Sequence, residues 1–122
     1  MFKNIIKKEP EIQARIIEPL VNIKEDDSEV VLEAYMSGVD KDNINVDLED
    51  NQLTIIGKQK NEDAPKGYTA LYRERCPFEY QRRFVLNFDV DRDKVTAKYD
   101  KGVLELRLPK IEIQHVKKIT IQ

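Results

Sequence analysis

The chain has 122 residues, a length that suits one domain with a single hydrophobic core. Its 21 lysine and arginine residues are nearly balanced by 23 aspartate and glutamate residues, which leaves a net charge of -2. Because the two signs are interspersed, the composition argues against a nucleic-acid partner, which would require a one-sided basic surface.

The N-terminal residues carry apolar side chains at helical spacing. These residues are Phe2, Ile5, Ile6, Ile12, Ile16 and Ile17. Pro10 is well placed to open a short helix, because proline is favoured in the first turn. The apolar stretch before Lys7 is too short for a membrane span or for a secretory leader, so we expect a cytoplasmic protein without a membrane span.

From Leu20 onward the dominant period of the apolar residues is two, which is typical of half-buried strands. Strands are expected over residues 20–24, 30–36, 44–49, 53–58, 80–86, 95–99 and 104–108. Asp50-Asn51 predicts a hairpin turn, since both residue types tolerate a left-handed backbone. This pattern predicts an all-β, immunoglobulin-like sandwich over residues 19–110, between a short arm (1–18) and an extended tail (111–122).

A long polar segment interrupts the strand pattern between Gln59 and Cys76, with Pro65 and Gly67 as breakers. Within this loop, a short strand is expected at Ala70, Leu71, Tyr72 and Arg73. A loop of this length in a compact domain is usually functional or makes contacts elsewhere.

Residues that carry catalytic or metal chemistry are scarce. Cys76 and His115 are the only residues of their kinds, so an internal disulfide, a thiolate cluster or a histidine pair is excluded. The run from Asp89 to Asp93 partly resembles a calcium loop, but Lys94 stands where glycine is required. We therefore predict no enzyme activity, no cofactor and no metal. Cys76 is expected to be a reduced thiol, with a disulfide to a second subunit as the alternative.

Two short sequence patterns occur in order near the C-terminus. The first, Ala97-Lys98-Tyr99-Asp100-Lys101-Gly102-Val103-Leu104, indicates a strand, a tight glycine turn and a second strand; the second is Ile119-Thr120-Ile121. With the strand pattern, they make the chain from about Pro19 onward resemble the small heat-shock proteins, the α-crystallin domain family. Lys101 departs from the family, which usually has asparagine or aspartate there, and the N-terminal arm is unusually short.

The resemblance implies that the tail docks on a neighbouring subunit and builds a homo-oligomer. Ile119 and Ile121 would point the same way on a strand, so both can enter one groove. The residues matching the family's groove are Ile44, Val46, Leu48, Val95 and Ala97. The alternative is that the tail closes the edge of its own sandwich. Ile111-Glu112-Ile113 has the same pattern but is interpreted as part of the tether.

The resemblance also implies a strand-exchanged dimer as the building block. The loop strand formed by Ala70, Leu71, Tyr72 and Arg73 would cross to the partner's sandwich, and Arg82 matches the family's core arginine near that interface. A buried arginine requires a carboxylate or several carbonyl groups. The alternative is an exposed Arg82 beside a loop that makes no exchange.

The function implied by the resemblance is that of an ATP-independent holdase, which binds partly unfolded client proteins and passes them to ATP-dependent refolding chaperones. The six apolar residues of the arm are the candidate client contacts, since apolar contact needs little specificity. One alternative is a structural, particle-forming member, such as a spore-coat protein, without general client protection. Another is a monomeric cochaperone that resembles CS-domain proteins and binds one defined partner.

Overall fold

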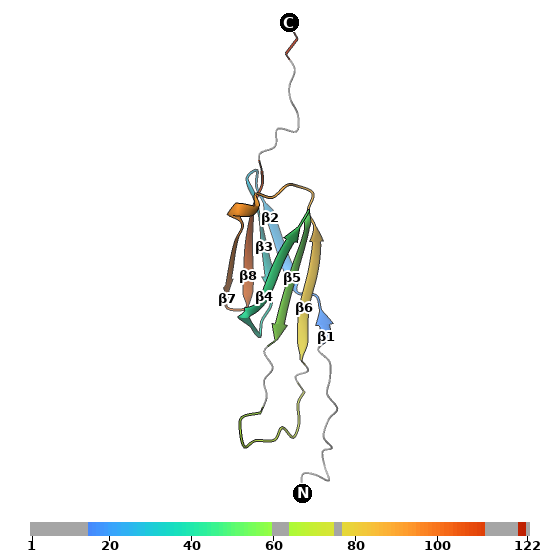
Figure 1. Ribbon diagram of the computed structural model, residues 1–122, viewed down its shortest axis with the longest axis vertical. Coiled ribbons are helices and arrows are strands. Elements are labelled where there is room, and N and C mark those ends of the chain that lie inside the picture. Colours follow the sequence, from blue (N-terminus) through green and yellow to red (C-terminus); the bar gives the residue numbers. More distant parts are fainter. Residues whose placement is uncertain (1–14, 60–63, 75–76, 112–119, 122) are drawn as a thin grey trace.

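In the computed structural model, residues 15–59, 64–74, 77–111 and 120–121 are described. They form two four-stranded sheets packed face to face, which confirms the predicted β-sandwich (Figure 1). The predicted site residues Phe2, Ile5, Ile6, Ile12 and Ile119, together with Cys76, lie outside the described residues.

Each sheet combines strands that are distant in the sequence. The first sheet has the order β1 (Arg15–Ile17), β6 (Phe78–Val85), β5 (Gln52–Gln59) and β4 (Val39–Glu49). The second has the order β2 (Leu20–Glu25), β3 (Glu29–Tyr35), β8 (Val103–Pro109) and β7 (Thr96–Asp100). A short 3-10 helix, η2 (Arg92–Lys94), leads into β7. Neighbouring strands run antiparallel, except that β1 runs parallel to β6.

The core lies between the sheets and follows the alternation expected from the sequence. Its members with 5% exposure or less include Val30, Leu32, Ala34, Met36, Leu53, Ile55, Leu104, Leu106 and Leu108. Full burial of one of the larger apolar side chains contributes about 1.5–3 kcal/mol, so this layer is the main source of stability.

Two hairpin turns depend on residues with a positive φ. Asp50, between β4 and β5, has a φ of 52°, while Lys101 and Gly102, between β7 and β8, have values of 50° and 81°. A Cβ atom on Gly102 would lie 3.2 Å from the Cα of Ser37. Glycine is therefore favoured at this position both by the positive φ and by the lack of room for a side chain. Both predicted turns are confirmed, although lysine lacks the short polar side chain that eases a left-handed backbone.

One local prediction was wrong. The helical spacing of Ile12, Ile16 and Ile17 predicted a helix, but the described part of that segment is strand β1, in which Ile17 pairs with Tyr80 of β6. This strand depends on a distant pairing partner, which local spacing does not reveal. Residues 70–73 form no strand within the single chain, and their pairing with a second subunit stays a prediction.

The turn between β2 and β3 is stabilised by one carboxylate. Asp26 Oδ1 accepts hydrogen bonds from the backbone N–H of Ser28 (2.8 Å), the Ser28 hydroxyl (2.9 Å) and the backbone N–H of Glu29 (2.8 Å). These bonds, the backbone bond from Ser28 first, hold the pKa of Asp26 below its ordinary value. The ionised carboxylate therefore favours the folded state.

We expect Asp26→Ala to lower the free energy of unfolding at neutral pH and to have little effect in acid. A depressed folded-state pKa adds stability above the unfolded value of about 3.9, and this stability is lost as the pH falls through the folded value. Urea unfolding at pH 7 and below pH 3 measures the difference. If Asp27→Ala, in the same turn, shows an equal loss with the same pH dependence, the Asp26 bonds do not stabilise the turn.

Candidate assembly surfaces

The predicted tail-receiving residues lie on two edge strands at the same side of the sandwich. Among the described residues, strand β4 pairs only with β5 and β7 only with β8, and both stand on one side in Figure 1. Ile44, Val46 and Leu48 of β4 are half-buried against the core, as is Val95 just before β7. Ala97 is exposed. We call this surface the β4–β7 edge.

Two polar contacts tie these strands together, one towards each end. The Tyr99 hydroxyl of β7 lies 2.7 Å from the carbonyl oxygen of Met36 and 2.9 Å from that of Val39. Burial raises the pKa of Tyr99 above its ordinary value, which keeps the hydroxyl available as a donor. Arg92 of η2 donates to the carbonyl oxygens of Leu48 (3.0 Å) and Asp50 (2.6 Å).

Sequence reasoning placed Tyr99 in a strand and assigned Arg92 no structural role. Both residues contact backbone carbonyls roughly 40 to 60 positions away, and no spacing rule marks such contacts. For Tyr99, the sequence indicated only that its side chain continues the alternation of Val95 and Ala97 and so faces the core side of the strand.

The root of the tail is fixed to the sandwich as far as Ile111. The backbone N–H of Lys110 donates to Ser28, and that of Ile111 donates to Asp89. The Lys110 ammonium lies 2.9 Å from both a Glu25 carboxylate oxygen and the Asp26 carbonyl. At the end of the tail, in contrast, the side chain of Ile121 is 92% exposed and does not pack on the sandwich.

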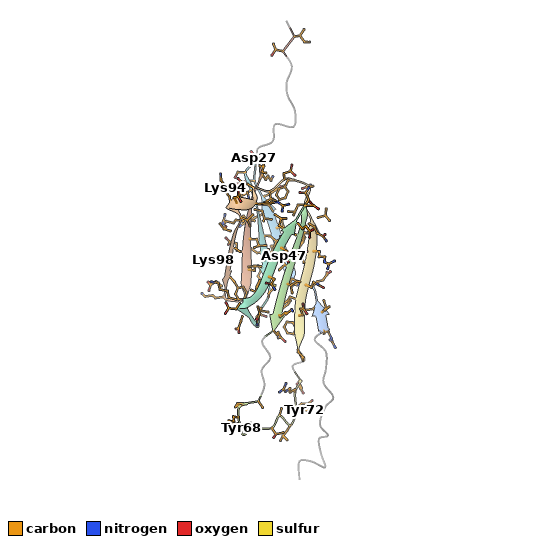
Figure 2. All side chains as sticks on the ribbon, in the orientation of Figure 1. Asp27, Asp47, Tyr68, Tyr72, Lys94 and Lys98 are labelled. Atoms are coloured by element: carbon orange, nitrogen blue, oxygen red, sulfur yellow. The ribbon has the colours of Figure 1, made fainter. Side chains whose placement is uncertain are left out.

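The opposite side of the sandwich carries another free edge. Within the part of the chain that the structure describes, strand β2 pairs with β3 alone, and Leu20 at its start is 78% exposed. The described part of the long loop also exposes apolar surface, with Leu71 45% and Tyr72 65% exposed. Figure 2 shows Tyr68 and Tyr72 on this loop, beyond the end of the sandwich.

Arg82 is half-buried, and its contacts differ from the expected carboxylate or group of carbonyls. Its guanidinium donates to the Pro19 carbonyl at 3.0 Å and lies 5.0 Å from the centre of the Phe84 ring. One carbonyl and one aromatic face partly replace the water that the charge has lost. Arg82 thereby holds the chain where it crosses from β1 to β2. Ala70 and Arg73, the outer members of the predicted loop strand, are both exposed.

No helix in the described ranges is long and apolar enough to cross a membrane. Nor do three or more histidine, cysteine, aspartate or glutamate side chains of these ranges come together so that they could hold a metal ion.

Comparison with known protein families gives a clear match. The Hsp20/alpha crystallin family model matches residues 22–122. Small heat shock protein C4 of Rickettsia felis is 36% identical over 107 residues, and a probable 15 kDa heat shock protein of Leptospira interrogans is 39% identical over 98 residues. These alignments cover 88% and 80% of this chain, and 66% and 74% of the respective relatives.

Solved structures show the same fold. Heat shock protein 16.0 from Schizosaccharomyces pombe aligns with a TM-score of 0.66 at 27% identity, covering 87% of this chain and 99% of the other. A small heat-shock protein from Xylella fastidiosa, described as having a distinct high order structure, aligns with a TM-score of 0.63 at 32% identity, covering 85% and 95%.

We expect Tyr99→Phe to loosen the β4–β7 edge. The change keeps the ring but removes the hydroxyl that reaches Met36 and Val39, so the free energy of unfolding should fall by about 0.5–1.5 kcal/mol. Urea unfolding measures this, and Tyr68→Phe is the matched control because Tyr68 is 74% exposed. Equal effects of the two substitutions would show that the contact does not tie the sheets together.

Proposed function

Because the chain belongs to the Hsp20/alpha crystallin family, we propose that it is an ATP-independent holdase that binds partly unfolded proteins under stress and prevents their aggregation. One observation carries the proposal: apolar residues are exposed along the free edges, the loop and the tail, among them Leu20 and Ile121. Such surfaces suit contacts with other subunits and with unfolding chains. The proposal includes a cytoplasmic location and release of clients to ATP-dependent refolding chaperones.

The assembly contact in this proposal is the tail of one subunit at the β4–β7 edge of another. Ile119 and Ile121 would lie against the half-buried apolar residues of β4, and the tail backbone would pair with its free edge. Burial of two isoleucines contributes roughly 3–6 kcal/mol before the cost of ordering the tail. Each contact is therefore individually weak and reversible.

The length of the tether limits which subunits can be joined. Since Ile111 is still bonded to Asp89, the tether from this point to Ile119 has eight residue steps. Eight extended residues span at most roughly 26–29 Å. This is about the length of one sandwich strand, so an acceptor edge on another subunit has to lie directly beside this one.

A dimer formed by loop exchange is the proposed building block. The loop residues Ala70 to Arg73 would pair with the free edge of β2 in the partner, which would turn a segment without regular structure into a strand. Arg82 lies close to this edge, because it is bonded to Pro19, the residue before β2.

Client contact is assigned to the arm. Ile16 is 61% exposed on β1, whereas Ile17 packs against the core and is not available while β1 stays paired. The proposal therefore retains Ile16 and the earlier residues Phe2, Ile5, Ile6 and Ile12 as client contacts. Loosening of the weak tail contacts on heating would expose more of the β4–β7 edge.

We expect Ile119→Ala with Ile121→Ala to reduce the particle to dimers, because the two side chains supply most of the apolar contact between dimers. Mass measurement by multi-angle light scattering tests this. The matched control is Ile111→Ala with Ile113→Ala, which changes the other I-x-I pattern and should leave the mass nearly unchanged. A full-sized particle after the tail substitutions would exclude the tail from the assembly contact.

For the chaperone activity, the direct test is light scattering of a heat-labile enzyme at its aggregation temperature, without nucleotide. Near-stoichiometric amounts of this protein should suppress the scattering. A large particle that gives no protection would favour the structural, particle-forming function. A monomer that gives no protection and binds one defined protein would favour the cochaperone function.

A further inference from the structure

The turn between β2 and β3 presents two backbone carbonyl groups to the root of the tail. The bonds within the turn use other groups, because the Asp26 N–H donates to the Glu29 carbonyl at 3.0 Å and Asp26 Oδ1 accepts from Ser28 and Glu29. The carbonyl oxygens of Asp26 and Ser28 accept hydrogen bonds from Lys110 instead. The turn is therefore shaped by its own bonds before it receives Lys110.

Lys110 makes four contacts at this turn, which we call the Lys110 clasp. Its backbone N–H donates to the Ser28 carbonyl at 2.8 Å, and its ammonium lies 2.9 Å from the Asp26 carbonyl and 2.9 Å from a Glu25 carboxylate oxygen. The ammonium also lies 5.8 Å from the centre of the Phe88 ring. Only 24% of the Lys110 side chain is exposed, so this long side chain has given up the freedom it would have in water.

The clasp lies where β2 ends and the tail begins. Glu25 is the last residue of β2, and Lys110 is the first residue after β8. Glu25 and Phe88 also line a cavity of about 290 Å³ between β2 and the C-terminal part of β6. Figure 2 shows Asp27 of the turn and Lys94 of η2 at this same end of the sandwich.

We propose that the Lys110 clasp fixes the direction in which the tail leaves the sandwich, and that this direction limits the particle to one subunit number. The inference rests on the proposed tail contact and concerns its regulation. A tether as short as one strand cannot compensate for a wrong starting direction, so a fixed root selects one placement of the neighbouring subunit. Repetition of one placement closes an assembly at a defined size, whereas a free root permits several placements.

The backbone bonds of the root are not sufficient for this role. They are the bonds from Lys110 to Ser28 and from Ile111 to Asp89, and Ile111 is itself 46% exposed. Exposed backbone bonds at the end of an element open readily. The side-chain contacts of Lys110 hold the root in place when these bonds open.

Spin-label distances test the direction of the tail without assembly through the tail. The parent is the full-length chain with Cys76→Ser, Ile119→Ala and Ile121→Ala, labelled at Asp47→Cys on β4 and at Glu112→Cys, the position after Ile111. An excess of unlabelled protein restricts the measured distances to single chains. We expect one narrow distance in the parent and its loss in Lys110→Met, which keeps an unbranched apolar stem but removes the charge.

Lys94→Met is the matched control, because Lys94 lies at the same end, is 75% exposed and is paired with Asp91 only at 3.7 Å. It should keep the narrow distance. A distance in Lys110→Met as narrow as in the parent overturns the inference, and so does equal broadening in Lys94→Met.

Native mass spectrometry of the chain with its natural tail tests the effect on assembly. Lys110→Met should replace one main subunit number with several, while Lys94→Met keeps the main one. The same subunit number in Lys110→Met, or several numbers already in the natural chain, overturns the inference. Failure of the proposed tail contact gives a different result: the particle keeps its mass when Ile119 and Ile121 are replaced by alanine.

Discussion

In the described ranges, both sheets of this sandwich end in strands that are hydrogen-bonded on one side only. β4 and β7 form the free edges on one side, and β2 is free on the other. Backbone N–H and C=O groups at such edges must bond to water or to another chain, and exposed edges are usually blocked in stable monomers. Here the apolar residues of β4 and the cavity beside β2 lie just behind the free edges, so another chain can gain both backbone pairing and apolar burial.

The two sides of the sandwich differ in how they are prepared for a partner. Tyr99 and Arg92 fix β7 and η2 to β4 through backbone carbonyls, so the proposed tail-receiving edge already has its shape within the single chain. The β2 side instead borders a cavity of about 290 Å³ with a mostly apolar lining. In the proposed function, dimers form at β2, and the weaker, reversible contacts between dimers form at the β4–β7 edge. Many weak contacts in one particle allow both stability and subunit exchange.

The sequence predicted those features that depend on neighbouring residues. Alternation located β2, β3, β5 and β8 to within about two residues, and the turns at Asp50 and Gly102 were identified from residue types that suit them. The sequence did not predict β1, because Arg15–Ile17 becomes a strand only through parallel pairing with β6. For the same reason it missed the cavity and the carbonyl contacts of Tyr99. These features join segments that only the folded sandwich brings together.

Hydrogen exchange on the assembled protein tests the central claim most directly. The edge-facing amides of β2 and β4 have no partner strand among the described residues of the subunit, so they would exchange rapidly in a monomer. We predict slow exchange at both edges in the native particle, with β4 alone becoming fast when Ile119 and Ile121 are replaced by alanine. Rapid exchange at both edges in the intact particle would contradict the claim that neighbouring subunits complete the sandwich.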